Sequence, residues 1–330
     1  RAVTRDLDWG VHIPLPGFEK KVLYVWFDAV LGYISGTKEW AAALGEPEKW
    51  KQYWTDPATK YVAFIGKDNV VFHCIVFPAM LMAWNDHEGA TRFILPENVP
   101  ANEFLNFEGQ KFSKSRGWGI DVDEFLDLFP ADSLRYALAM NLPEARDADF
   151  TWRDFQARQN NELADTLGNF VNRTVTFAHA HFDGVVPDAG GREADATVVG
   201  AEILAAGNSA GTAFEQYRFR DGTQAVMNLA RFANKYFNDA EPWKSVKRDR
   251  PAAAATIAGS LRLVRALAIY LEPVLPGTSS RIWEILRLPG TPAGAGWEQA
   301  SAQSPAAGHA LGKAEILFTK IEDSMIQDRL

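Results

Sequence analysis

The sequence holds a single cysteine, Cys74, among its 330 residues. One thiol excludes an internal disulfide, and it also excludes any zinc site built from several cysteines. The sequence shows no charged stretch followed by an apolar leader and no long apolar run, so the pattern predicts neither secretion nor membrane insertion. We therefore expect a cytoplasmic chain without a membrane partner.

Basic residues are outnumbered as well. The chain has 34 lysines and arginines against 42 aspartates and glutamates, which gives a net charge of −8. This acidic balance argues against a broad electrostatic grip on nucleic acid, so such a partner would be held by local basic groups and stacking aromatic side chains. With 47% hydrophobic residues the chain can bury a proper core, and its length favours two domains.

Several catalytic motifs are absent. The sequence contains no G-x-x-x-x-G-K-[ST] phosphate loop, no H-E-x-x-H and no G-x-S-x-G. His87 and His309 have no partner at metal-ligand spacing, so surface positions suit them better than a metal site. The enzyme classes that depend on these motifs therefore lose support.

The first half of the chain mixes strand-like and helical segments. Residues 21–30 and 60–68 are short β-branched and aromatic runs that end in polar residues or glycine, as buried parallel strands do. Residues 70–84 are too long and too rich in Met and Ala for one strand, so we expect a buried helix there, followed by a strand near 103–107. This order predicts a doubly wound α/β sheet.

From about residue 121 the pattern becomes helical. Apolar residues recur at spacings of three and four along one predicted helix face: Leu163, Leu167, Phe170, Thr174 and Phe177. Further helices are predicted over residues 195–217, 222–239, 251–272 and 276–287. Residues 289–310, rich in Pro, Gly and Ala, are expected to form a loop, and residues 311–327 to dock back on the helices.

A flexible basic loop, EGQKFSKSRGWG, occupies residues 108–119. Gly109 and Gly117 let the backbone approach a ligand, and the ammonium groups of Lys111 and Lys114 suit phosphate oxygens. Such a loop can close over a polyphosphate. Taken alone, however, a stretch of this kind is more often a solvated basic turn, so the rest of the chain decides its role.

The sequence KFSKS at residues 111–115 closely resembles the KMSKS signature of class I aminoacyl-tRNA synthetases, with Phe112 in place of methionine. The stretches YVWFDAVLGYIS, FIGKDNVVFHCIVFPAML and GNFVNR, with a later EPW, are similar to those of methionyl-tRNA synthetases. These matches follow in family-like order over most of residues 1–287. The resemblance implies a fold that is α/β and then all-α.

Four regions follow from this resemblance. They are the second half of a Rossmann-like catalytic domain over residues 1–107, a KMSKS-loop and stem-contact region over 108–150, a helical-bundle anticodon-binding domain over 151–287, and a tail over 288–330 that packs on the bundle. The implied activity is ATP-dependent activation of L-methionine and its transfer to tRNA(Met), with Mg²⁺ bound together with ATP. Lys114, supported by Lys111, would stabilise charge on the phosphates.

The resemblance also assigns three sets of binding residues. Those for ATP are Gly66, Asp68, Lys111, Phe112, Ser113, Lys114 and Ser115. Those for methionine are Trp26, Ala29, Tyr33, Phe72, His73 and Phe77, and those for the anticodon are Asn169, Arg173 and Trp243.

Each set has a physical reason to suit its ligand. A thioether contacts aromatic faces and edges well, although Trp26 and Phe72 would suit ordinary core packing on pattern alone. Asp68 follows a predicted strand, where it can accept hydrogen bonds from ribose or cap the next helix; the role of Asp28 stays open. Asn169 and Arg173 are four apart, so they share a helical face and are expected to point outward together.

The sequence also departs from the family pattern. It contains no H-x-G-H for the HIGH motif and no zinc-bearing inserted domain, so the chain resembles a C-terminal portion that lacks the first catalytic half. We expect no zinc in it and no activity from it alone. Val30 stands where the family often has proline, which leaves the contour beside Ala29 in question.

Two alternatives stay open. Another class I synthetase, for leucine, isoleucine, valine or cysteine, would share the loop and the bundle but not the aromatic pocket. A non-catalytic tRNA-binding module would have kept only the bundle.

Overall fold

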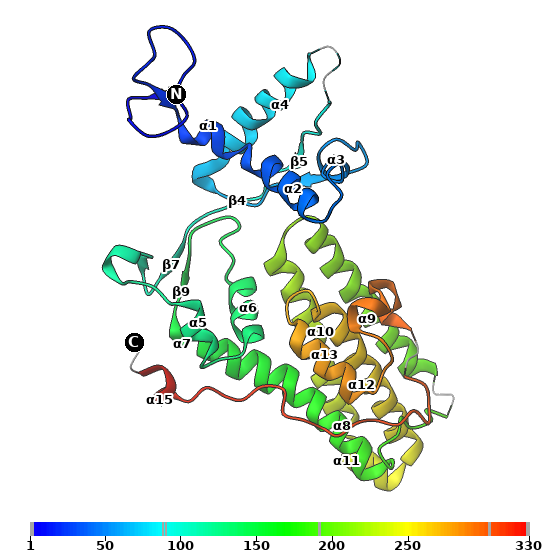
Figure 1. Ribbon diagram of the computed structural model, residues 1–330. Helices are drawn as coiled ribbons and strands as arrows, with labels where there is room; N and C mark the ends of the chain where they lie inside the picture. Colours follow the sequence, from blue (N-terminus) through cyan, green and yellow to red (C-terminus); the bar gives the residue numbers. More distant parts are fainter. Residues whose placement is uncertain (1–2, 88, 90, 191–192, 303–304, 328–330) are drawn as a thin grey trace. The chain divides into compact units, whose positions relative to one another are not determined.

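The computed structural model describes residues 3–87, 89, 91–190, 193–302 and 305–327, apart from the side chains of Lys114 and residues 193–196. The chain divides into two compact units (Figure 1). The first unit comprises Arg1–Phe104 with Pro143–Asp147, and the second comprises Leu105–Leu142 with Ala148–Leu330.

Short parallel strands organise the first unit. β3 (Tyr61–Val62) pairs with β5 (Pro96–Asn98), and β4 (Ile65–Gly66) pairs with β6 (Ala101–Asn102). Parallel neighbours need a crossover, which here contains η2 (Phe72–Val76) and α4 (Phe77–Asn85). The strand predicted over 60–68 is thus confirmed as two short pieces. The helix predicted over 70–84 is confirmed too, but the expectation that it is buried is wrong, because only one face is covered and Ile75, Met82 and Trp84 are exposed.

The strand predicted over residues 21–30 is wrong for most of its length. Only β2 (Val22–Leu23) is extended, and it runs antiparallel to β1 (Thr4–Arg5). The chain then enters α1 (Val25–Ala29) and α2 (Gly32–Ala43). Val30 and Ile34, four residues apart, are both buried, so the apolar residues after the strand follow a helical period.

The core of the first unit is aromatic. Trp50 and Trp54, at α3 (Lys51–Trp54), pack with Phe72, Phe77 and the buried residues of α2 and α4. The indole N–H of Trp54 donates to the hydroxyl of Thr37 at 2.9 Å. Because these rings come from α3, η2 and α4 and pack with apolar residues of α2, the cluster holds the helices together around the short strand pairs.

A three-stranded sheet begins the second unit. β7 (Leu105–Phe107) lies between the antiparallel β8 (Gln110–Lys111) and the parallel β9 (Ala148–Phe150). The strand predicted near 103–107 is therefore confirmed. Helices α5 (Val122–Leu126) and α6 (Ala131–Met140) pack against this sheet through a cluster whose aromatic members are Phe107, Phe125, Phe129, Phe150, Trp152 and Phe155.

One long helical path links this sheet to the bundle. It consists of α7 (Trp152–Ala157), η4 (Arg158–Gly168) and α8 (Asn169–His181). The predicted seam is confirmed: Leu163, Leu167, Phe170 and Thr174 are buried, and Phe177 is partly buried. Gly168 lies where a side chain would come within 3.2 Å of the Leu163 carbonyl oxygen and of the Phe318 ring, so the path can pass closely under the C-terminal segment.

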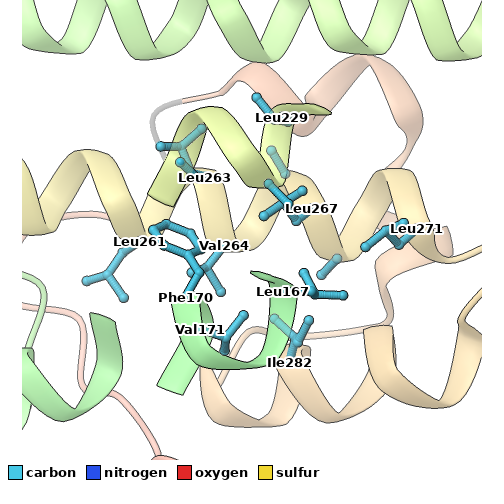
Figure 2. Packing of buried hydrophobic residues seen from close by; sticks show 14 of the residues in the cluster. Leu167, Phe170, Val171, Leu229, Leu261, Leu263, Val264, Leu267, Leu271 and Ile282 are labelled. Carbon is cyan, nitrogen blue, oxygen red and sulfur yellow. The ribbon is translucent and has the colours of Figure 1, made fainter. Parts of the chain in front are cut away.

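The rest of the bundle follows the predicted helices within a few residues. It contains α9 (Glu193–Glu215), α10 (Phe219–Ala240), α11 (Pro242–Arg248), α12 (Arg250–Leu271) and α13 (Pro276–Ile285). Figure 2 shows Leu167 and Phe170 packed against Val264 and Leu267 of α12. Helix α12 is long and apolar enough for a membrane span, but 89% of its most apolar window is buried, as in the core helix of a bundle.

The C-terminal segment returns along the long helical path, as predicted for residues 311–327. The His179 ring donates to the Gly312 carbonyl at 2.7 Å, and Gln159 donates to the Thr319 carbonyl at 2.9 Å. Its last helix, α15 (Asp323–Ile326), buries Ile326 in the aromatic cluster of the sheet. The predicted loop before this segment contains two short helical turns, α14 (Pro292–Ala295) and η5 (Trp297–Ser301).

Gly207 of α9 allows the close approach of α12. A Cβ at this position would lie 2.2 Å from the hydroxyl oxygen of Tyr270, which donates to the Ile203 carbonyl. We expect Gly207→Ala to lower the free energy of unfolding by about 1–3 kcal/mol, because the ring would have to move in a packed core. Urea unfolding followed by circular dichroism measures the change.

Gly200 is the matched control on the same helix. A Cβ there would lie 3.4 Å from a guanidinium nitrogen of Arg262, which is ordinary contact. Gly200→Ala should therefore be neutral or slightly stabilising. Equal losses of stability in the two variants would contradict the packing argument.

Candidate functional site

The basic loop is closed at its base by hydrogen bonds that its backbone N–H groups donate. Gly109, which has a φ of 73°, donates its N–H to both carboxylate oxygens of Asp149 at 2.9 and 3.0 Å. Ser113 and Trp118 then pair across the loop, with N–H to carbonyl distances of 2.8 and 3.0 Å. The tip between them contains the turn η3 (Lys114–Arg116). The loop is thus a short tip on a firmly paired base.

Aromatic rings pack against the paired base of the loop. The Phe112 ring stacks on Phe107 with centroids 5.6 Å apart, and the Trp118 ring lies 5.3 Å from the same ring. The Trp118 indole N–H donates to the Phe107 carbonyl at 3.1 Å. A side chain at Gly119 would approach the Phe112 ring at 3.1 Å, so glycine leaves room for phenylalanine in this motif. Sequence reasoning missed Phe107 and Trp118, although the aromatic residues flanking the basic stretch were a signal.

The predicted ATP-binding residues fall into two groups. Lys111, Phe112 and Ser115 are exposed on the loop, and the hydroxyl oxygens of Ser113 and Ser115 lie 3.3 Å apart. The Lys114 side chain lies outside the described part of the structure.

The other two predicted residues, Gly66 and Asp68, lie in the first unit, where both are exposed at the end of β4. Gly66 is the N-cap residue of η1 (Lys67–Asn69), and Asp68 lies within that turn, so a capping role for Asp68 is wrong.

Lys67, between these two residues, is held by two carboxylates. Its ammonium group contacts Glu103, lies 2.9 Å from Asp147 and sits 4.3 Å from the centre of the Phe104 ring. The hydrogen bonds that Lys67 donates to Glu103 and then to Asp147 raise the pKa of Lys67, and Lys67 in turn lowers the pKa of Asp147. These contacts tie the end of β4 to the segment after β6, and sequence reasoning did not find them.

The predicted methionine residues form a largely aromatic group on α1, α2, η2 and α4. Trp26 stacks on Phe72 with centroids 5.7 Å apart, and Tyr33 lies 6.4 Å from Phe77. Trp26 and Tyr33 are 37% and 48% exposed, whereas Phe72 and Phe77 are buried beneath them. Ala29 is exposed on α1, one turn from Trp26. The group therefore presents two aromatic faces over a buried aromatic floor.

His73 joins this group through its ring nitrogens. Nδ1 lies 3.0 Å from the Asn69 carbonyl, which can only accept, so Nδ1 carries the proton. Nε2 then accepts a hydrogen bond from the Tyr33 hydroxyl at 3.0 Å. Because the imidazole is buried, this pairing fixes the orientation of Tyr33 at the surface.

A second aromatic group lies on the bundle. The Arg173 guanidinium is 4.2 Å from the centre of the Phe237 ring, and the Trp243 ring lies 6.3 Å from Phe237 on its own helix, α11. Trp243 is 44% exposed and Asn169 is exposed. The structure thus brings Arg173 and Trp243 together through Phe237, which sequence reasoning missed.

The expectation that Arg173 points freely outward is wrong. Its guanidinium lies across α10, where it donates to the Asn234 carbonyl at 3.3 Å, and burial lowers the pKa of the group. The guanidinium turns to Phe237 because a flat cation gains by stacking on an aromatic face. In the described part of the chain, no group of three or more His, Cys, Asp or Glu side chains could hold a metal ion.

Two family models match the chain in succession. Residues 1–175 match "tRNA synthetases class I (M)", and residues 186–329 match "Anticodon binding domain of methionyl tRNA ligase". Methionine–tRNA ligases of Chlorobaculum tepidum and Chlorobium chlorochromatii are 50% and 52% identical to it, and each match covers 100% of this chain and 48% of the relative. The chain therefore spans about half the length of these relatives.

A solved structure is similar over nearly the whole chain. The Mycobacterium tuberculosis methionyl-tRNA synthetase in complex with methionyl-adenylate has a TM-score of 0.80 and 26% identity. The match covers 96% of this chain and 60% of that chain.

The Tyr33–His73 hydrogen bond gives a test of the aromatic group. Tyr33→Phe leaves the buried Nε2 of His73 without its donor, so the free energy of unfolding should fall by about 1–3 kcal/mol. Tyr53→Phe is the matched control, because Tyr53 is 46% exposed, close to the 48% of Tyr33. Urea unfolding gives the free energy of unfolding of both variants. Equal losses in the two would show that the Tyr33–His73 hydrogen bond does not stabilise the fold.

Proposed function

The chain belongs to the class I methionyl-tRNA synthetase family, and from this premise we propose that it forms the loop-bearing part of the catalytic domain and the anticodon-binding domain of a cytoplasmic methionine–tRNA ligase. The observation that carries the proposal is the match of both family models, in order, over residues 1–175 and 186–329. Membership of this family excludes a synthetase for leucine, isoleucine, valine or cysteine.

The proposed reaction has two steps. A carboxylate oxygen of methionine attacks the α-phosphorus of ATP, and the bond to the pyrophosphate leaving group breaks, which yields methionyl-adenylate. A ribose hydroxyl at the 3′ end of tRNA then attacks the activated carbonyl, and AMP leaves. Positioning and charge stabilisation supply most of the catalysis in such phosphoryl chemistry.

The aromatic group of the first unit suits the methionine side chain. Trp26 and Tyr33 offer exposed ring faces, and a thioether sulfur is attracted to such rings. Phe72 and Phe77 form the floor, and the small side chain of Ala29 leaves space beside Trp26 on α1. His73 contributes by orienting the Tyr33 hydroxyl.

The nucleotide residues supply complementary contacts. Gly66 leaves the backbone open to close approach, and the Asp68 carboxylate can accept hydrogen bonds from ribose hydroxyls. On the loop, Lys111 and Lys114 carry positive charge, and Ser113 and Ser115 carry hydroxyl donors. Phe112 anchors the paired base of the loop by stacking on Phe107. Mg²⁺ bound with ATP would neutralise further phosphate charge.

The remaining chain length of the relatives suggests further protein on the first unit. Large apolar side chains are exposed on it, among them Phe64, Ile75 and Trp84. Exposed side chains of this kind are what a face covered by another part of the protein would carry. We place the first catalytic half there, and we retain residues 1–107, 108–150, 151–287 and 288–330 as the proposed functional regions.

The stacked group on the bundle suits the anticodon. Trp243 gives an exposed stacking surface, Arg173 is held beside it by Phe237, and Asn169 can pair with a base edge. An acidic chain needs such local contacts to hold RNA. The proposal as a whole is tested by methionine-dependent exchange of pyrophosphate with ATP, followed by charging of tRNA(Met), in the full-length protein.

Lys114 is the loop residue proposed to stabilise the transition state. In the full-length enzyme, Lys114→Ala should lower the rate of adenylate formation about 10²–10³-fold, because a preorganised cation would be lost, and methionine affinity should stay nearly unchanged. Stopped-flow kinetics measures the rate of adenylate formation, and equilibrium binding measures the affinity for methionine.

Lys235→Ala, on the exposed face of α10, is the control. If Lys114→Ala instead lost methionine binding at an unchanged rate, the loop would belong to the amino-acid pocket.

Trp243 and Arg173 are proposed to contact the anticodon. Loss of one stacked base or base contact costs roughly 1–3 kcal/mol, so Trp243→Ala or Arg173→Ala should weaken charging of tRNA with a CAU anticodon by one to two orders of magnitude. Methionine activation should be spared, and Arg231→Ala, on the exposed side of α10, should change neither.

Phe237→Leu tests whether stacking on Phe237 is what holds the Arg173 guanidinium in its functional position. It removes the ring on which the Arg173 guanidinium lies, so it should reproduce part of the Arg173→Ala defect. Full preference for CAU over an altered anticodon in all three variants would place the anticodon site elsewhere.

A further inference from the structure

A pocket of about 570 Å³ lies in the first unit beside α1, and none of the residues assigned above lines it. Its lining includes Arg5, Trp9, His12, Tyr24, Val25 and Asp28. The volume falls in the range of roughly 300–1,000 Å³ that is usual for small-molecule sites. The N-terminal hairpin that forms one wall can be followed next to α1 in Figure 1.

The wall of this pocket is built by backbone pairing on both sides of β2. Leu23 donates to the Val11 carbonyl at 2.8 Å, and Tyr24 donates to the Val3 carbonyl at 2.8 Å. Gly10 has a φ of 143°, and a Cβ there would lie 3.0 Å from the buried Val22 side chain. Only glycine fits this turn without strain, and the turn leaves the preceding residue, Trp9, 90% exposed.

The side chains around the pocket suit a nucleoside at the end of a single strand. The exposed indole of Trp9 offers a stacking surface for a base. The Asp28 carboxylate can accept from ribose hydroxyls or an exocyclic amine, and His12 adds a further polar contact. Arg5 lies over the Tyr24 ring at 3.9 Å, which brings a positive charge to the wall.

Helix α1 places this pocket next to the aromatic group. Val25 and Asp28, three residues apart, line the pocket. Trp26 and Ala29, also three residues apart, lie about 100° further round the same helix. One helix therefore separates the two sites.

We propose that this pocket receives the 3′-terminal nucleotide of tRNA, an inference that rests on the proposed function. In the transfer step a 3′-terminal ribose hydroxyl must reach the carbonyl of the bound aminoacyl group, so the terminal nucleotide has to lie immediately beside the amino-acid site. The pocket across α1 has that position, the aromatic surface and the hydroxyl acceptor. It also gives a role to Asp28.

The test separates transfer from activation in the full-length protein. Methionyl-adenylate is formed on the enzyme and isolated as the complex, and a single round of transfer to tRNA is then timed. Trp9→Ala and Asp28→Asn should slow transfer at limiting tRNA tenfold or more, while methionine-dependent pyrophosphate exchange stays within twofold. Trp9→Phe, which keeps a stacking ring, should restore most of the rate. Trp40→Ala is the matched control, because Trp40 is 42% exposed in the same unit but does not line the pocket.

A competition measurement uses tRNA that lacks its terminal adenosine. The unmodified enzyme should bind complete tRNA more tightly than the shortened one, and Trp9→Ala should lose that difference. Unchanged transfer in both variants, or exchange slowed as much as transfer, would overturn the inference. Failure of the unmodified enzyme to activate methionine would instead overturn the proposed function, and the competition would still report on the pocket.

Discussion

Burial of one apolar seam on the long helical path is the constraint on which the second unit depends. Leu167 and Phe170 pack against α12 (Figure 2), and Leu163 is buried in the same core, so burial fixes which side of the path remains for other contacts. The opposite end of the path begins in the aromatic cluster of the sheet, because Trp152 and Phe155 belong to that cluster. The helix therefore joins the sheet that carries the basic loop to the bundle that carries Arg173 as one packed body.

The C-terminal segment reinforces this joint by ordered polar contacts. Asn160 accepts from the Ile321 N–H at 2.8 Å and donates to the Ile321 carbonyl at 2.9 Å, so one amide side chain satisfies both backbone groups of the segment. Ile321 and Ile326 then close the aromatic cluster beneath β7. A segment without regular structure is thus held by paired hydrogen bonds and by burial at its end, which is how irregular backbone meets its polar requirements.

Helical periodicity in the sequence predicted most of the bundle, because a seam of threes and fours over many residues has no competing interpretation. The first unit was harder: a two-residue strand and a short helix share residues 21–30, and their apolar composition is alike. The contacts between side chains at the candidate sites could not be predicted, because they form between residues that only the tertiary structure brings together. Arg173 turns to Phe237, and Lys67 turns to Glu103 and Asp147, since each finds a partner that is distant along the chain. The family resemblance named candidate binding residues, but it did not supply these supporting contacts.

The acidic balance of the chain explains why its candidate sites combine rings with few cations. A net charge of −8 repels polyanions at long range, so binding must gain at contact distance. At the loop, Phe107 and Trp118 hold the paired base that carries Lys111; on the bundle, the Arg173 guanidinium lies on the Phe237 ring beside Trp243. Stacking is insensitive to the sign of the distant field, and a cation held in place loses less entropy when it meets a phosphate or a base. A ring also holds a cation beside α1, where the Arg5 guanidinium lies over the Tyr24 ring and the same pocket includes the exposed indole of Trp9. At Arg173 and at Arg5 an aromatic ring therefore holds a single cation in place, which suits a chain whose net charge is negative.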